Sequence, residues 1–200
     1  MLQQQLVNAL SLGCVYALFA LGFTLVFGVL GVINLSHGAV FMVGAYVALQ
    51  LITQFDLPLW AGLAAAAAGS GIVGILIDVL VLKRLRKRNA PHLIPMIATI
   101  GVAIALNSGM QGIYGAANMR FPSGLVPDDA IEIAGLHMTV IELVIIFLSF
   151  ALMAALMVVM KRTQLGRGLR AIAESPKAAS LLGINVEGLF MLTSFAAAAL

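Results

Sequence analysis

The chain has 200 residues, of which 62% are hydrophobic and 10% are charged, and its mean hydropathy is +1.09. A soluble domain is nearer to half apolar and about a quarter charged. The composition therefore argues against a soluble enzyme, a disordered chain and a disulfide-rich scaffold, and Cys14 is the single cysteine. It is typical of an all-α polytopic membrane protein.

Positive charge is concentrated in two places. The net charge is +3, and ten of the eleven Lys and Arg residues lie in the stretches 83–88 and 161–177, with Arg120 as the eleventh. Basic clusters between apolar segments are typical of cytoplasmic loops, because Lys and Arg resist translocation. This distribution argues against a nucleic-acid partner.

The first apolar run predicts two helices. Residues 6–52 contain no Lys, Arg, Asp or Glu and far exceed the about 20 residues that one span needs. We expect helices at 6–30 and 39–51, with a break at the polar, glycine-flanked stretch 31–38.

Apolar runs later in the chain predict further spans. Helices are expected at 59–82, 93–114 and 139–160, separated by the basic stretch after residue 82 and by a polar segment at 115–138. A sixth span begins at residue 189, and only about half of it is present. We therefore expect five complete transmembrane helices and a truncated sixth, in a fragment of a longer polypeptide.

The basic loops set the orientation. Loops 83–91 and 161–188 are separated by two spans, so both face the cytoplasm and loop 115–138 lies on the other side of the membrane. The N-terminus is then outside if both halves of 6–52 cross the membrane, and a re-entrant segment would reverse it.

A short helix is predicted inside loop 161–188. Ser175 is a good N-cap residue, Pro176 suits the first helical position, and Gly183 is placed for a left-handed C-terminal turn. A two-turn helix is marginal alone in water, so it must dock. Its Leu181 and Leu182 are equally suited to packing on the membrane domain or in a groove of a cytoplasmic partner.

Polar groups within the apolar runs have two interpretations. Asn34, Ser36 and His37 either line a path or satisfy the broken backbone of the 31–38 break. Asn107 and Gln111 share one face of the 93–114 helix and serve either helix packing or a substrate pathway. No nucleotide-binding loop, metal-ligand spacing or hydrolase elbow is present in the sequence, so we expect no enzyme activity.

The intramembrane carboxylates lie near helix ends. Asp78 is five residues from Lys83, and it is expected to reach the interface or to pair with Lys83 or Arg84. Glu142 is expected to complement the N-terminus of the 139–160 helix.

Three segments resemble the branched-chain amino acid ABC importer permeases of the LivH type. They are LGCVYAL at 12–18, GVLGVINLSHGAVFMVGAY at 28–46 and RTQLGRGLRAIAESPKAASLLGIN at 162–185. The resemblance covers essentially the whole chain. Many members carry Glu after the His-Gly pair, where this chain has Ala39, which weakens any role that rests on that carboxylate and loosens the substrate assignment.

The resemblance implies near eight helices in a chain approaching 300 residues, placed in the bacterial inner (plasma) membrane among its lipids. It also implies a LivM-type partner permease, two cytoplasmic ABC ATPase subunits that bind ATP and Mg, and a periplasmic amino-acid-binding protein. This chain itself would hold no cofactor. We expect one transmembrane permease domain over 1–200, with 161–188 as its cytoplasmic coupling loop.

The resemblance also assigns candidate residues. The coupling helix of 176–182 would sit in a cleft of the ATPase, and the coupling residues are Glu174, Ser175, Pro176, Ala178, Leu181, Leu182 and Gly183. The candidate pathway residues are Asn34, Ser36, His37, Asn107 and Gln111. The alternatives are a permease for urea, short amides or other amino acids, a stand-alone secondary carrier or channel, and a membrane-embedded enzyme.

Overall fold

The computed structural model describes residues 2–91, 93–115, 117, 119–121, 130–133 and 136–200. Within them, five helical segments are long and apolar enough to cross a membrane, as the sequence predicts. They are α1 (Leu2–Leu30), α2 (His37–Phe55), α3 (Leu59–Ile77) with its continuation, α5 (Leu93–Tyr114) and α6 (Val140–Arg162). The continuation of α3 is a π-helical turn, η1 (Asp78–Leu82), followed by α4 (Lys83–Lys87).

Three further helices and a hairpin complete the described fold. Loop 161–188 contains α7 (Gln164–Glu174) and α8 (Pro176–Leu181), whereas the sequence predicted only the second of them. The apolar helix α9 (Val186–Ala199) begins three residues earlier than expected. The polar segment before α6 contains the antiparallel strands β1 (Ala130–Ile133) and β2 (Leu136–Thr139), which were not predicted.

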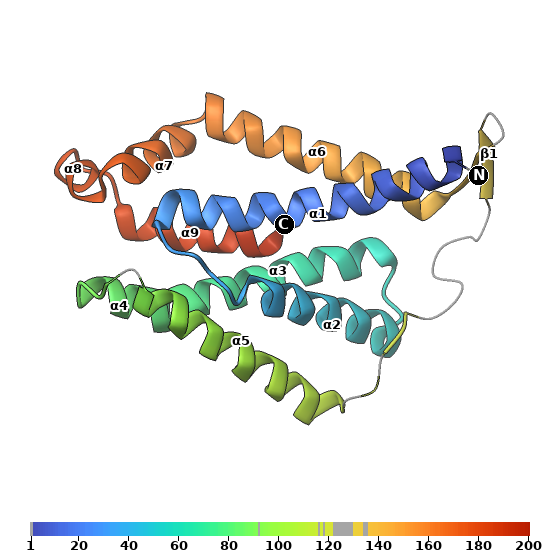
Figure 1. Cartoon of the computed structure of the whole chain (residues 1–200), viewed down its shortest axis with the longest axis horizontal. Coiled ribbons are helices and arrows are strands. Elements are labelled where there is room, and N and C mark those ends of the chain that lie inside the picture. The colour runs from blue at the N-terminus through green and yellow to red at the C-terminus, as the bar shows by residue number, and fades with distance from the viewer. Residues whose placement is uncertain (1, 92, 116, 118, 122–129, 134–135) are drawn as a thin grey trace.

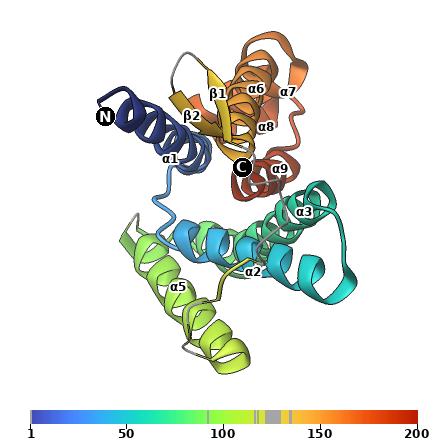
Figure 2. The same ribbon diagram turned by 90° about the vertical axis from the view of Figure 1, so that its right-hand side faces the viewer.

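The long helices lie in two groups that run along the same axis. α1, α6 and α9 form one group, and α2, α3 and α5 form the other, with α9 packed against α3 between them (Figure 2). The basic α4 and the α7–α8 pair lie at the same end of the molecule, opposite the hairpin (Figure 1). Both basic regions therefore lie at one end of the described bundle.

Capping groups fix the start of α6. The Thr139 hydroxyl accepts the backbone N–H of Glu142 at 3.3 Å, and the Glu142 carboxylate accepts the backbone N–H of Thr139 at 2.9 Å. This reciprocal pair satisfies two helix N-terminal donors. Glu142 therefore stabilises the N-terminus of α6, as predicted.

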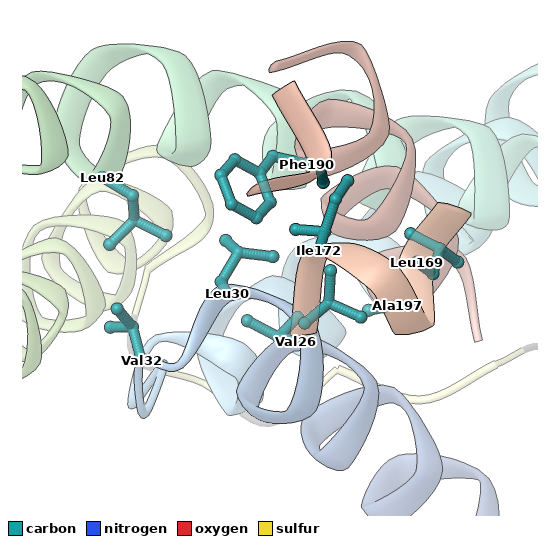
Figure 3. Packing of buried hydrophobic residues seen from close by; sticks show 10 residues of the cluster. Val26, Leu30, Val32, Leu82, Leu169, Ile172, Phe190 and Ala197 are labelled. Carbon is teal, nitrogen blue, oxygen red and sulfur yellow. The ribbon is translucent and has the colours of Figure 1, made fainter. Parts of the chain in front are cut away.

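The main buried apolar cluster lies at the end of the bundle that holds α7 and α8 (Figure 3). It joins side chains from α1, the break after α1, η1, α7, α8 and α9. Its buried members are Val26, Val29, Leu30, Val32, Leu82, Leu169, Ile172, Ala179, Phe190 and Ala197. Burial of this apolar surface fixes the short loop helices to the ends of the membrane helices.

Candidate coupling and translocation sites

Both ends of α8 are capped by the residues that the sequence singled out. The Ser175 hydroxyl accepts the backbone N–H of Ala178 at 3.2 Å, and Pro176 occupies the first turn. At the other end Gly183 has φ +81. The Gly183 and Ile184 N–H groups donate to the carbonyls of Ser180 and Ala179, both at 3.1 Å. This pair of hydrogen bonds is a Schellman motif, so the C-terminal end of α8 is well defined although the helix is short.

One face of α8 is anchored and another is exposed. Ala179 is 2% exposed within the apolar cluster, whereas Leu181 and Leu182 are 84% and 80% exposed. The two leucines therefore do not dock on the described membrane domain, which was one of the two alternatives for them. Glu174 and Ala178 are also exposed. The result is a capped helix whose two leucines are exposed rather than packed on the bundle.

A buried ion pair lies within the end of the α3 segment, and its arginine contacts α9. Asp78 is fully buried, and Arg86 donates to its two oxygens at 2.7 and 3.3 Å. The Arg86 guanidinium also lies 4.4 Å from the centre of the Phe190 ring on α9. Nearby, Lys83 and Glu187 form a more exposed ion pair at 3.1 Å. The expectation that Asp78 pairs with Lys83 or Arg84 is therefore wrong.

The π-helical turn explains the different partner. In a regular α-helix, residues eight apart, such as Asp78 and Arg86, are offset by about 80° around the axis. The one extra residue of a π turn reduces this offset to about that of residues seven apart, roughly 20°. Asp78 and Arg86 therefore face the same side, toward Phe190.

Glycines allow α3 and α9 to approach closely. A methyl group added at Gly74 would lie 2.6 Å from the Ser194 carbonyl oxygen and from Ala198, and one at Gly71 would lie 2.5 Å from the Phe195 ring. Only glycine fits such positions without a shift of the neighbouring helix. Because α8 leads directly into α9, movement of α8 would be passed to α3.

The break between α1 and α2 is shorter than predicted and is well satisfied. α1 ends before Gly31 (φ +66), and α2 begins at His37 rather than at Ala39. The Asn34 side-chain oxygen accepts the Ser36 hydroxyl at 2.6 Å and its backbone N–H at 3.1 Å. Ser36 is fully buried, so these two predicted pathway residues satisfy the broken backbone.

Thr99 on α5 supports the same break from the other side. Its buried hydroxyl accepts the Leu35 backbone N–H at 3.1 Å and donates to the Met96 carbonyl at 2.8 Å. Threonines within apolar helices are common, so the sequence carried no signal for this role.

His37 lies deep in the bundle. It is 7% exposed, its ring centre lies 4.7 Å from that of Phe19, and a methyl group at Gly22 would approach it to 3.1 Å. Gly22 is about 12 Å along the axis from the end of α1. His37 is therefore buried inside the bundle, because the chain at 31–36 turns back into it.

His37 borders a cavity of about 180 Å³ between α1, α2, α6 and α9. Most of the lining is apolar, including Leu18, Phe41 and Ile145, and the buried Ser149 adds a second polar group. The cavity therefore suits a small and largely apolar group.

Asn107 and Gln111 do not meet the other pathway residues. Both are exposed on α5, as are Gly101 and Gly112, around which a methyl group would have open space. This face of α5 has no neighbour among the described residues. Across all the residues that the structure describes, no cluster of His, Cys, Asp or Glu could hold a metal ion.

The chain matches known proteins along almost its whole length. The family model described as "Branched-chain amino acid transport system / permease component" matches residues 5–200. No solved structure matches the chain significantly.

Individual relatives agree with this match. The chain is 34% identical to the high-affinity branched-chain amino acid transport system permease protein BraD of Pseudomonas aeruginosa and to LivH of Salmonella typhimurium. In each case the similarity covers 98% of this chain and 67% of the relative. A probable LivH of Methanocaldococcus jannaschii is 34% identical over 85% of this chain and 54% of the relative. The chain therefore spans about two thirds of the length of its bacterial relatives.

Proposed function

Because the chain belongs to the family of permease components of branched-chain amino acid transport systems, we propose that it carries branched-chain amino acids across the bacterial plasma membrane as one subunit of an ATP-driven importer. Its partners in this proposal are a LivM-type permease, two cytoplasmic ABC ATPases that bind ATP and Mg, and a periplasmic binding protein. The described residues act as one permease domain, and 161–188 forms its coupling loop.

The orientation follows from charge. α4 and the α7–α8 pair carry ten basic residues between them and their flanks, and they lie at one end of the bundle (Figure 1). Lys and Arg are retained on the cytoplasmic side. We therefore place loops 83–91 and 161–188 in the cytoplasm and loop 115–138 in the periplasm.

The exposed pair Leu181 and Leu182 is the observation that carries the proposal. Exposed apolar side chains on a well-fixed helix mark a protein interaction site. At the cytoplasmic end of an ABC permease, the partner with a matching groove is the ATPase. ATP would favour the closed ATPase pair and so select one of two orientations of the permease.

The close contacts around α9 supply the route for this movement. α8 is linked to α9 by the short turn that starts at Gly183. α9 is joined to the α3 segment through the contact of Arg86 with Phe190 and through the close approach of α9 at Gly71 and Gly74. These buried joints make α8, α9 and α3 one rigid unit. Displacement of α8 by the ATPase would then tilt the walls of the cavity beside His37.

The pathway itself is proposed at two places. His37 and its cavity form the wall that this subunit supplies within the bundle, while Asn34 and Ser36 hold the broken backbone that positions His37. Asn107 and Gln111, exposed on α5, would contribute from a face that a second permease subunit completes. Broken helices at membrane depth are a recurrent feature of transporter binding sites.

Reconstitution tests this function. The chain and its partner subunits in liposomes should take up leucine only with ATP and the binding protein. Leu181→Asp should reduce uptake and binding-protein-stimulated ATP hydrolysis at least tenfold, since it places a charge in an apolar groove. Leu165→Asp is the matched control, because Leu165 is exposed on α7 outside the coupling residues. Equal activity of both variants would contradict the coupling role, and uptake without the ATPase would indicate a stand-alone carrier.

A further inference from the structure

A groove opens between α4 and α8, beside the proposed coupling helix. It encloses about 460 Å³ and is lined by residues of α1, α4, α8 and α9. Its basic side chains are Arg86, Lys87 and Lys177, and its apolar side chains are Leu30, Pro176, Val186 and Phe190. The groove therefore combines cationic and apolar walls.

The positive charge in this groove is only partly neutralised. Among the described residues, ion pairs join Arg86 to Asp78 and Lys83 to Glu187. Glu187 is the one acidic residue that lines the groove, and its charge is neutralised by Lys83. Lys87 and Lys177 have no carboxylate within ion-pair distance in the described part of the chain, and both side chains are exposed. Two charges therefore remain to attract an anion.

The groove lies where membrane helices end. Leu30 is the last residue of α1, Lys87 ends the apolar segment Leu59–Lys87, and Val186 is the first residue of α9. This level is the headgroup region of a bilayer rather than its interior or the free solution. The exposed Leu181 and Leu182 are not part of its lining, whereas Pro176, one of the proposed coupling residues, is. An ATPase docked on the two leucines would therefore border the groove at Pro176 and leave its α1, α4 and α9 side to another occupant.

We propose that this groove binds the phosphate group of an anionic phospholipid, with the headgroup between Lys87 and Lys177 and the acyl chains leaving past Leu30 and Val186. Basic pockets between membrane helices at the cytoplasmic surface favour such lipids. The bound lipid would join α4 to α8 by two charge-assisted contacts. The lipid would thereby hold the coupling helix α8 against the end of the α3 segment, which contains Asp78, and against α9, which contains Phe190. The cytoplasmic position rests on the proposed function.

A neighbouring groove provides a contrast within the same molecule. It lies between α1, α6 and α7, and Arg170 is its only basic lining residue. The Arg170 guanidinium donates to the Met160 carbonyl. The single cation of this groove already has a hydrogen-bond partner, so the groove offers no pair of unpaired positive charges to a phosphate. The lipid site is therefore assigned to the α4–α8 groove.

Native mass spectrometry of the intact transporter, released from membranes that contain phosphatidylglycerol, tests this site. Lys87→Gln/Lys177→Gln should retain phosphatidylglycerol about thirtyfold more weakly than the unaltered complex, because two basic contacts at an anionic surface are lost. The matched control is Arg88→Gln/Arg167→Gln, which removes the same charge from exposed positions outside the groove. Its retention should equal that of the unaltered complex.

Equal retention by the two double variants would overturn the proposal. Displacement of the lipid by excess inorganic phosphate would also overturn it, in favour of a small-anion site. Loss of the ATPase from the groove variant with unchanged lipid retention would instead make an acidic segment of the ATPase the occupant. Lipid retention is measured without transport, so its outcome is independent of the uptake assay with Leu181→Asp.

Discussion

At the scale of single residues, the buried carboxylate of Asp78 makes the sharpest prediction for stability. Asp78→Asn removes the charge that faces the Arg86 guanidinium, and removing one partner of a buried ion pair typically costs about 3–5 kcal/mol. We expect a clearly lowered thermal unfolding temperature of the purified protein in detergent. Lys83→Gln is the comparison, because the Lys83–Glu187 pair is more exposed and exposed pairs contribute about 0–1 kcal/mol.

A double variant separates the interaction energy of the Asp78–Arg86 pair from the cost of substituting each residue alone. Asp78→Leu/Arg86→Leu replaces both charges and should cost less than the sum of the two single leucine variants. Strictly additive losses would show that the 2.7 Å contact contributes no coupling energy.

Thr99 gives a second prediction at this scale. Thr99→Val leaves the Leu35 N–H without its acceptor inside the bundle, and an unsatisfied buried donor costs about 1–3 kcal/mol. Thr99→Ser retains the hydroxyl and should unfold near the temperature of the unaltered protein. If valine and serine were tolerated equally in a thermal unfolding assay, the hydrogen bond from Leu35 would not hold the break in place.

Single residues were predictable where local geometry decides their role. Ser175, Pro176 and Gly183 act over two or three neighbours along the chain, and all three adopt the predicted cap positions. Arg86 and Thr99 act on groups far away in sequence or across a π turn. No periodicity records such contacts, so the sequence led to the wrong partner for Asp78.

At the scale of elements, α8 depends on its caps because it has only 6 residues. Ser175→Ala removes the acceptor of the Ala178 N–H and should cost about 1 kcal/mol. Hydrogen exchange of the α8 amides should then rise about fivefold, with less leucine transported per ATP hydrolysed. Ser175→Thr preserves an N-cap oxygen and should restore both values. Unchanged exchange in the alanine variant would mean that docking of Ala179, not the cap, defines α8.

The long elements followed directly from hydropathy, since no other segments satisfy the length of a span. The five predicted spans are present, with ends shifted by a few residues. α7 was not predicted, although the apolar residues of its 11-residue sequence recur at helical spacing. The π turn at Asp78–Leu82 was not predicted either, because its sequence DVLVL is an ordinary apolar helix sequence.

At the scale of the whole molecule, the two basic regions gather at one end while the extended break turns inward (Figure 1). The first arrangement was predictable from charge and the parity of the spans. The second was not, because a polar stretch between two apolar runs is equally compatible with a surface turn. The position of His37 therefore had to come from packing against Phe19 and Gly22.

α8 is the proposed contact with the ATPase. A cysteine in place of Leu181, combined with a cysteine in the ATPase groove of the assembled transporter, tests this contact most directly. We predict a disulfide crosslink for Leu181→Cys that stops leucine uptake until it is reduced. Phe55→Cys should give none, because Phe55 is the exposed last residue of α2, and α2 ends on the side of the bundle away from α8 (Figure 1). A fully assembled and active transporter in which Leu181→Cys forms no crosslink to the ATPase would contradict the account.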